Sequence, residues 1–171
     1  MSDTLANFMF DNENFLVDDE ESLTFLYEDE EETVKDSDID SWNVMIVDDD
    51  AEMHKVTKFA LQSFEFENKN ISFISAYSGE EAKRLIATER NVAIILLDVV
   101  MESNDSGLQV AKHIREVAKN EEVRIILRTG QPGEVSEDTV IFNYDINDYK
   151  IKTELTHQKL LNTIVLALRG A

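Results

Sequence analysis

A chain of 171 residues, 43% of them hydrophobic, is long enough to bury the core of one ordinary domain. The absence of cysteine excludes a disulfide framework, a thiolate metal site and a cysteine nucleophile. The net charge of −20 argues against nucleic-acid binding, and the longest apolar run, VAIILL, is too short to span a bilayer, so we expect a soluble cytoplasmic protein.

Residues 1–41 differ in composition from the rest of the chain. They contain fifteen acidic residues and one lysine, so the remaining residues carry a net charge of only about −6. Acidic blocks (DDEE, EDEEE) alternate with isolated apolar clusters (FMF, FLV, LTFLY) without a sustained period. We expect a disordered acidic leader over 1–41, either solvated or able to order on a partner, and a folded domain over 42–171.

The folded part begins with a short run of apolar residues. VMIV, residues 44–47, predicts a strand, and Asp50 is expected to be the N-cap of a helix over about 52–66. The apolar residues of this helix recur at spacings of three and four, at Met53, Val56, Ala60 and Phe64. That spacing predicts the buried face of the helix.

Two further strands and helices follow. We predict strands over 71–77 (ISFISAY) and 92–98 (VAIILLD), the second continuously apolar like a central strand covered on both faces. Ser78 and Glu81 form a capping-box pattern at the start of the intervening helix. The expected buried faces are Ala82, Leu85 and Ile86 in this helix, and Leu108, Ala111, Ile114 and Ala118 in the next.

The last part of the chain repeats the pattern twice. VRIILRT, residues 123–129, predicts a strand, and a GQPG loop separates it from a less periodic helix that ends near Tyr144. A strand over about 147–151 precedes the final helix, which Gly170 is expected to cap. The apolar residues of that helix are Leu160, Leu161, Ile164, Val165 and Leu168.

Five strand–helix repeats in about 130 residues predict an α/β fold with a doubly wound parallel sheet, because parallel strands need crossover connections. We expect a flavodoxin-like (βα)5 three-layer sandwich with the strand order 2-1-3-4-5. In such sheets, ligands bind outside the carboxyl ends of the strands, beside the first and third strands. The functional site is therefore expected at that edge.

The residues at the ends of the predicted strands carry the chemistry. Asp48 and Asp49 end the first strand, Asp98 the third, Thr129 the fourth and Lys152 the fifth. Three carboxylates repel one another unless a hard divalent cation lies among them, and Mg2+ prefers such oxygen ligands. The hydroxyl of Thr129 and the charge of Lys152 can hold the oxygens of a transferring phosphoryl group. The set therefore indicates phosphoryl transfer to a carboxylate.

Over residues 43–171 the sequence resembles the receiver domains of bacterial two-component response regulators. Four motifs carry the resemblance: VMIVDDD, IILLDVVM, IILRTG and DYKIK. The resemblance implies a signalling domain that accepts a phosphoryl group on Asp98 from a sensor histidine kinase or phosphotransfer protein, and that catalyses only its own phosphorylation and dephosphorylation.

The same resemblance implies a role for each site residue. Asp49, Asp98 and the backbone carbonyl of Val100 would bind Mg2+ directly, and Asp48 through a water molecule. Lys152 would pair with the phosphoryl oxygens, and Thr129 and Tyr149 would rearrange on phosphorylation. The output face, and a homodimer interface, would then be formed by the fourth helix, fifth strand and fifth helix.

Three positions depart from the usual receiver pattern. Glu102 replaces a proline, Gly107 comes one residue late, and Thr153 replaces the proline that usually follows the lysine. The segments LLDVVMES and LRTGQPGE are similar to those of a subgroup of receivers. In that subgroup an acidic leader precedes the receiver domain and further signalling modules follow it, some of them cyclic di-nucleotide phosphodiesterases. The chain stops where a linker to such an output domain would begin, and the sequence leaves open whether it is a fragment.

Two other functions remain open at this point. Asp48 and Asp50 form a D-x-D pattern, which is found in haloacid-dehalogenase-type Mg2+ phosphatases, although that class needs an acidic pair after the lysine and only Glu154 is present. A degenerate receiver could act only as a binding module. The three histidines, His54, His113 and His157, lie on separate predicted helices and are expected to have no chemical role.

Overall fold

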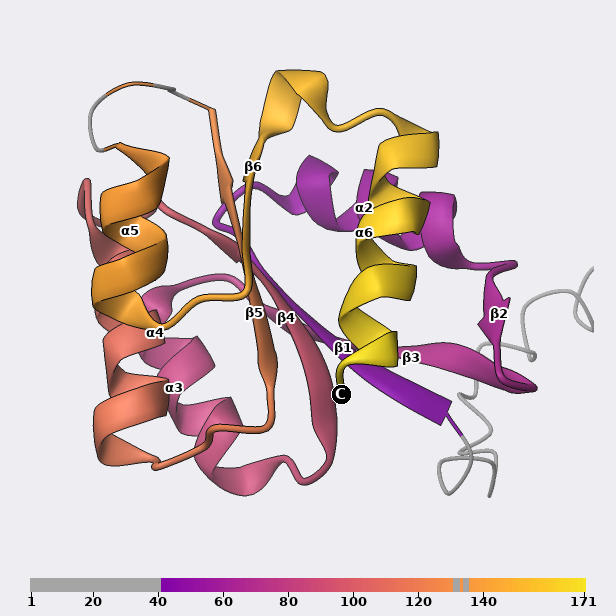
Figure 1. Ribbon diagram of the computed structural model, residues 1–171, viewed down its shortest axis with the longest axis horizontal. Coiled ribbons are helices and arrows are strands. Elements are labelled where there is room, and N and C mark those ends of the chain that lie inside the picture. Colours follow the sequence, from indigo (N-terminus) through magenta and orange to yellow (C-terminus); the bar gives the residue numbers. More distant parts are fainter. Residues whose placement is uncertain (1–40, 131–132, 134–135) are drawn as a thin grey trace, which may run out of the picture. The chain divides into compact units, whose positions relative to one another are not determined.

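The computed structural model describes residues 41–130, 133 and 136–171 (Figure 1). The predicted leader lies outside these residues except for Ser41, which already belongs to the first strand. Within the described part, no helix is long and apolar enough to cross a membrane.

The centre of the fold is a six-stranded sheet with the order β2-β3-β1-β4-β5-β6. Five strands are parallel: β1 (Ser41–Val47), β3 (Lys69–Ala76), β4 (Val92–Asp98), β5 (Arg124–Thr129) and β6 (Asp148–Ile151). Numbered without β2, they have the predicted order 2-1-3-4-5, so the flavodoxin-like topology is confirmed. The additional strand, β2 (Glu65–Phe66), is antiparallel to β3 at the sheet edge.

Helices cover both faces of the sheet (Figure 1). One layer contains α2 (Ala51–Leu61) and α6 (His157–Arg169). The other contains α3 (Gly79–Thr88), α4 (Ser106–Lys112) and α5 (Glu137–Tyr144). A π-helical turn, η2 (His113–Val117), continues α4, and a short 3-10 helix, η3 (Lys152–Glu154), follows β6.

Each layer has its own apolar core. Against α3, α4 and α5 the sheet buries Met45, Val47, Ile95, Leu97, Ile125 and Leu127. Against α2 and α6 it buries Val44, Ile94, Leu96 and Ile126. Because successive side chains of a strand point to opposite faces, β4 supplies residues to both cores and is apolar throughout, as expected.

The first helix is shorter than predicted. It ends at Leu61, and a hairpin joins β2 to β3 through Glu67 (φ 52°) and Asn68 (φ 61°). Two central residues with positive φ form the kind of two-residue turn that matches the twist of paired strands. The indole Nε1 of Trp42 also donates a hydrogen bond to the carbonyl of Phe66 (3.0 Å) and fixes the edge strand.

The predicted buried face of this helix is only partly correct: Ala60 and Phe64 pack against the core, but Val56 does not. The residues that α2 buries are His54, Thr57 and Leu61. Val56, expected inside, is 59% exposed, and its neighbour Phe59 is 75% exposed. The helix is therefore rotated so that two polar side chains face the sheet.

The other helices follow the predicted patterns, with two corrections. Ser78 caps α3 by accepting from the N–H of Glu81, but the Glu81 carboxylate accepts from the N–H of Tyr77 and not from Ser78 (2.7 Å). Ala118 is exposed, because the π-helical turn adds a residue and rotates the chain away from the core. Gly170 caps α6 as predicted.

Candidate functional site

The predicted site residues meet at the carboxyl edge of the sheet. Asp48 and Asp49 follow β1, Asp98 ends β4, Thr129 ends β5, and Lys152 follows β6. These strands are adjacent in the order β1-β4-β5-β6, so the fold brings together residues that are up to about a hundred positions apart in the sequence.

The three carboxylates form one cluster. Asp48, Asp49 and Asp98 each offer an oxygen atom, and these atoms all lie within 4.8 Å of one another. Asp48 and Asp98 are buried, whereas Asp49 is exposed. Burial raises the pKa of the Asp98 carboxyl above its usual range, and Lys152 opposes that shift. The cluster therefore has a high density of negative charge with one side open to solvent.

The donor set fits a hard divalent cation. Oxygen atoms of three carboxylates that lie within 4.8 Å of one another can share one such ion. The backbone of Val100 lies two residues beyond Asp98 in the loop between β4 and α4.

Lys152 contacts two of the three carboxylates. Its Nζ lies 2.9 Å from Oδ2 of Asp48 and 3.1 Å from Oδ2 of Asp98. Thr153, which replaces the usual proline, lies in η3 and does not prevent Lys152 from contacting both carboxylates. The lysine thus lies beside one carboxylate oxygen of each of the two buried aspartates.

The loop after β1 is held by hydrogen bonds to its own residues and to α2. Oδ1 of Asp48 accepts from the N–H of Asp50 (3.0 Å), and Asp50 caps α2 as predicted. Nε2 of His54 lies 2.8 Å from the carbonyl oxygen of Asp48, which can only accept, so Nε2 carries the proton. Its Nδ1 lies 3.2 Å from Oγ of Ser75. His54 therefore orients the loop that presents Asp48 and Asp49.

The loop after β4 accommodates the two other departures from the receiver pattern. The N–H of Gly107 donates to the carbonyl of Val99 (2.9 Å), and a Cβ at Gly107 would collide with the carbonyl oxygen of Asp98. Glu102 accepts a hydrogen bond from the N–H of Gly79 at the start of α3 (2.8 Å). The loop is thus tied to the first turn of α4 and to the start of α3.

The site contains one charged residue that the sequence patterns did not predict. Arg128, on β5 beside Thr129, is 1% exposed, and its Nη2 lies 3.5 Å from Oδ2 of Asp48. Its Nη1 donates to the hydroxyl of Thr57 on α2 (3.0 Å). The available sequence signal was a charged residue inside an otherwise apolar strand.

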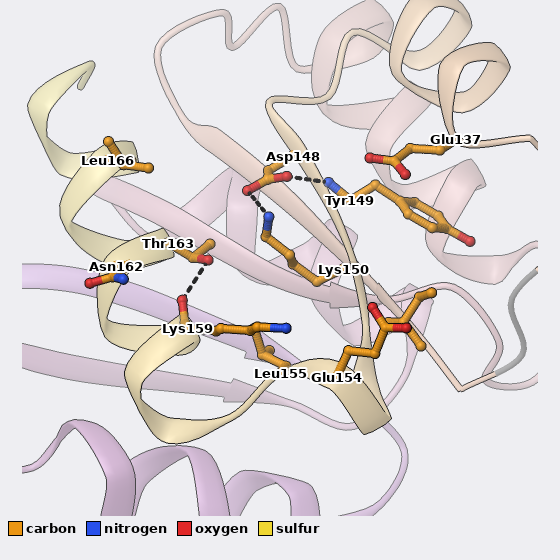
Figure 2. Close-up of a pocket in the computed structure, with 11 residues that line it drawn as sticks. Glu137, Asp148, Tyr149, Lys150, Glu154, Leu155, Lys159, Asn162, Thr163 and Leu166 are labelled. Atoms are coloured by element: carbon orange, nitrogen blue, oxygen red, sulfur yellow. Dashed lines mark hydrogen bonds and ion pairs between the residues drawn. The ribbon is translucent and has the colours of Figure 1, made fainter.

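The two expected switch residues lie on neighbouring strands. Thr129 is buried at the end of β5, and Tyr149 is half-buried on β6, packed against the core under α3, α4 and α5. Tyr149 also lines a groove of about 440 Å3 formed by residues of β6, α6 and the start of α5 (Figure 2). In that view Tyr149 and Glu137 lie on one side of the groove, and Thr163 and Leu166 of α6 lie on the other.

Comparison with known proteins identifies the family. The sequence model of the family of response regulator receiver domains matches residues 44–165, from β1 into α6. The chain therefore belongs to this family. The match decides against the haloacid-dehalogenase alternative. It makes the domain a signalling phosphoacceptor, as the four motifs indicated.

Individual relatives agree with this assignment. The 3'3'-cGAMP-specific phosphodiesterase 2 of Vibrio cholerae is 47% identical over 129 residues, which are 75% of this chain but only 25% of that protein. The CheY-like receiver domain protein of Methanospirillum hungatei superposes with a TM-score of 0.61 at 20% identity, covering 75% of this chain and 94% of the other. The BeF3-activated DrrB receiver domain has a TM-score of 0.56 at 21% identity, covering 75% and 98%. The two solved structures bear on the fold alone.

Proposed function

We propose that Asp98 accepts a phosphoryl group from a sensor histidine kinase or phosphotransfer protein and that the phosphorylated domain controls an output. The observation that carries the proposal is the buried Asp98 carboxylate, whose Oδ2 lies 3.1 Å from Nζ of Lys152 within a cluster of three carboxylates. A buried nucleophilic oxygen beside a cation and a candidate metal site is what transfer of a phosphoryl group requires.

In the transfer step, an oxygen of Asp98 forms a bond to the phosphorus of a phosphohistidine while the P–N bond breaks. The bonding electron pair returns to the imidazole nitrogen, which takes a proton from solvent. Lys152 pairs with the phosphoryl oxygens as negative charge accumulates on them, and the hydroxyl of Thr129 donates to another. These two groups stabilise charge and do not themselves transfer protons.

Asp48, Asp49, Asp98 and the carbonyl of Val100 would hold Mg2+, which neutralises charge on the phosphoryl oxygens when it is bound. His54 supports this role by fixing the carbonyl of Asp48 and hence the position of the loop.

The output face that we propose is formed by α5, β6 and α6, the fourth helix, fifth strand and fifth helix of the predicted repeats. Thr129 moves toward the phosphoryl group, and Tyr149 rotates into the space that it leaves. Tyr149 lines the groove on this face, so its rotation changes a surface that a second copy of the chain or an output domain can bind (Figure 2). The name of the Vibrio cholerae relative supports a cyclic di-nucleotide phosphodiesterase as that output domain in the full-length protein.

Binding of beryllofluoride in the presence of Mg2+ tests the proposal. We expect the parent chain to bind this phosphoryl analogue and Asp98→Asn to fail, because the acceptor oxygen is lost. Asp105→Asn, in an exposed position of the loop after β4, is the matched control and should bind like the parent. A parent chain that binds no beryllofluoride would support the degenerate receiver.

The switch is tested separately by NMR of the Tyr149 ring. We expect its resonances and those of its neighbours on β6 to shift when beryllofluoride binds to the parent and to stay unchanged in Asp98→Asn. Unchanged Tyr149 resonances in the activated parent would contradict the proposed coupling.

A further inference from the structure

Arg128 places a second cation next to the acidic cluster, in addition to Lys152. In the sheet, Arg128 of β5 is the register partner of Asp98 of β4, and its carbonyl accepts from the N–H of Val99 (3.0 Å). Its side chain runs to the α2 side of the sheet, where Nη1 donates to Thr57. The guanidinium is thus fixed behind the carboxylates and not on the surface of the domain.

Burial of this charged side chain does not by itself favour the folded state, so we looked for a functional role of its charge in the site. Arg128 is 1% exposed, and its Nε and Nη2 donate no hydrogen bond. Buried donors without acceptors destabilise a fold, and apolar side chains of similar volume often replace buried ion pairs without loss of stability. Asp48, whose Oδ2 lies 3.5 Å from Nη2, already has Lys152 as a closer cationic partner at 2.9 Å. Stability alone therefore gives no reason for an arginine here.

The formal charge of the site changes with its ligands in a way that depends on Arg128. Three carboxylates and two cations leave the metal-free site with one net negative charge. A divalent cation makes the site net positive by one charge. A phosphoryl group on Asp98 replaces one negative charge by about two, so the site that holds both ligands is neutral. Without Arg128 the metal-loaded site would be neutral before phosphorylation and negative after it.

We propose that Arg128 is a positioning residue that couples the two ligands of the site. Its charge weakens the binding of a divalent cation to the unphosphorylated site and strengthens retention of the anionic phosphoryl group. With Arg128 present, the site is therefore neutral when both ligands are bound and positive when the divalent cation is bound alone. This inference rests on the proposed function, because it takes Asp98 as the residue that carries the phosphoryl group.

Thr57 sets the direction of the guanidinium. Its hydroxyl donates to the carbonyl of Met53 (2.7 Å) and accepts from Nη1 of Arg128 (3.0 Å), which ties the arginine to the backbone of α2. Replacing Thr57 by valine keeps the shape of the side chain but removes this acceptor, so the charge of Arg128 is retained while its position is released.

The test compares two ligands on the same variants of the full chain. Mg2+ alone is titrated by calorimetry, and beryllofluoride is then titrated at a Mg2+ concentration that saturates each variant. We expect Arg128→Met to bind Mg2+ about tenfold more tightly and beryllofluoride about tenfold more weakly than the parent, in line with one unit of charge at short range. Arg128→Lys should stay closer to the parent in both titrations. Arg84→Met removes an exposed arginine of α3 and should change neither.

The two shifts have opposite signs, which a structural defect would not produce. If Arg128→Met weakens both ligands, or changes neither, the coupling is contradicted. If Arg128→Met does not unfold cooperatively, Thr57→Val takes its place, with smaller shifts in the same two directions expected and no shift contradicting the inference. A parent chain that binds Mg2+ but no beryllofluoride would instead overturn the proposed function on which the coupling rests.

Discussion

The two helical layers of this domain bury different kinds of side chain. Apart from Ser106 at the start of α4, the side chains that α3, α4 and α5 bury against the sheet are apolar: Ala82, Ile86, Leu108, Val110, Ala111 and Val140. The layer of α2 and α6 buries His54, Thr57 and Thr163 besides its leucines and Ile164, and it also covers Arg128 of the sheet.

The two layers therefore have different roles: one mainly stabilises the fold, and the other contacts the residues of the functional site. The apolar layer stabilises the fold by packing, which is independent of what the site binds. The polar residues of α2 instead form hydrogen bonds to Asp48 and Arg128, so this layer should respond to the ligands of the site. Substitutions in the two layers are therefore expected to differ in kind as well as in size.

The largest effect is expected at Gly107, where α4 of the apolar layer crosses the end of β4. A Cβ here would lie 2.8 Å from the Cα of Val99 and collide with the carbonyl oxygen of Asp98, and backbone cannot give way as a side chain can. We expect Gly107→Ala to lower the free energy of unfolding by about 3 kcal/mol or more in urea titrations. Gly130→Ala, which meets nothing within 4 Å, should change it little, and equal effects would contradict the account.

A comparable loss is expected from a cavity in the same layer. Ile114 in η2 is fully buried, so Ile114→Ala should cost about 3 kcal/mol of unfolding free energy. Val117→Ala, one turn further on at a position that is 67% exposed, should cost little. The loss at Ile114 should be the same with and without Mg2+. If the loss of unfolding free energy in Ile114→Ala depended on Mg2+, the proposed difference between the two layers would be contradicted.

A smaller effect that involves the site is expected in the polar layer. His54→Phe keeps a ring that can stack on Tyr77, whose centroid is 4.2 Å away, but leaves the carbonyl of Asp48 without its donor. We expect a loss of about 1–2 kcal/mol of unfolding free energy together with weaker Mg2+ binding. His157→Phe removes an exposed hydrogen bond to the carbonyl of Ala60 and is the matched control. Unchanged Mg2+ affinity in His54→Phe would show that the histidine only fills space.

The smallest effect is a pH dependence at Asp98. Burial raises the pKa of this carboxyl in the folded state, so the metal-free folded protein binds more protons than the unfolded chain between the two pKa values. Its free energy of unfolding therefore falls as pH rises through that window. Asp98→Asn stays neutral and should be more stable than the metal-free parent at pH 7, with the difference vanishing below pH of about 4. Melting curves across this range test it, and an advantage that grows as pH falls would contradict the sign.

The sequence predicted the apolar layer and the strand order, because both depend on patterns of apolar residues. VAIILLD matched β4 to the residue, and the stripes of α3 and α6 were correct, with Leu161 and Val165 only half-buried. The carboxylates, Thr129 and Lys152 were brought to one edge as expected, since strand ends of a parallel sheet meet there.

The polar layer could not be predicted in the same way. The buried face of α2 was predicted from the spacing of apolar residues. That spacing includes Val56, which is exposed, and leaves out the polar residues His54 and Thr57, which are buried. The role of Arg128 depends on the register of β4 with β5 and on the position of α2, which are tertiary properties. The π-helical turn of η2 likewise has no signal in the spacing of apolar residues.

The central claim, that Asp98 is the phosphoacceptor, is tested most directly by locating the phosphoryl group. The chain is incubated with a small phosphodonor and Mg2+, the acyl phosphate is reduced with borohydride, and the modified residue is identified by mass spectrometry of peptides. We predict modification at Asp98 and none in Asp98→Asn. A phosphoryl group on Asp48, or an unmodified parent chain, would contradict the account.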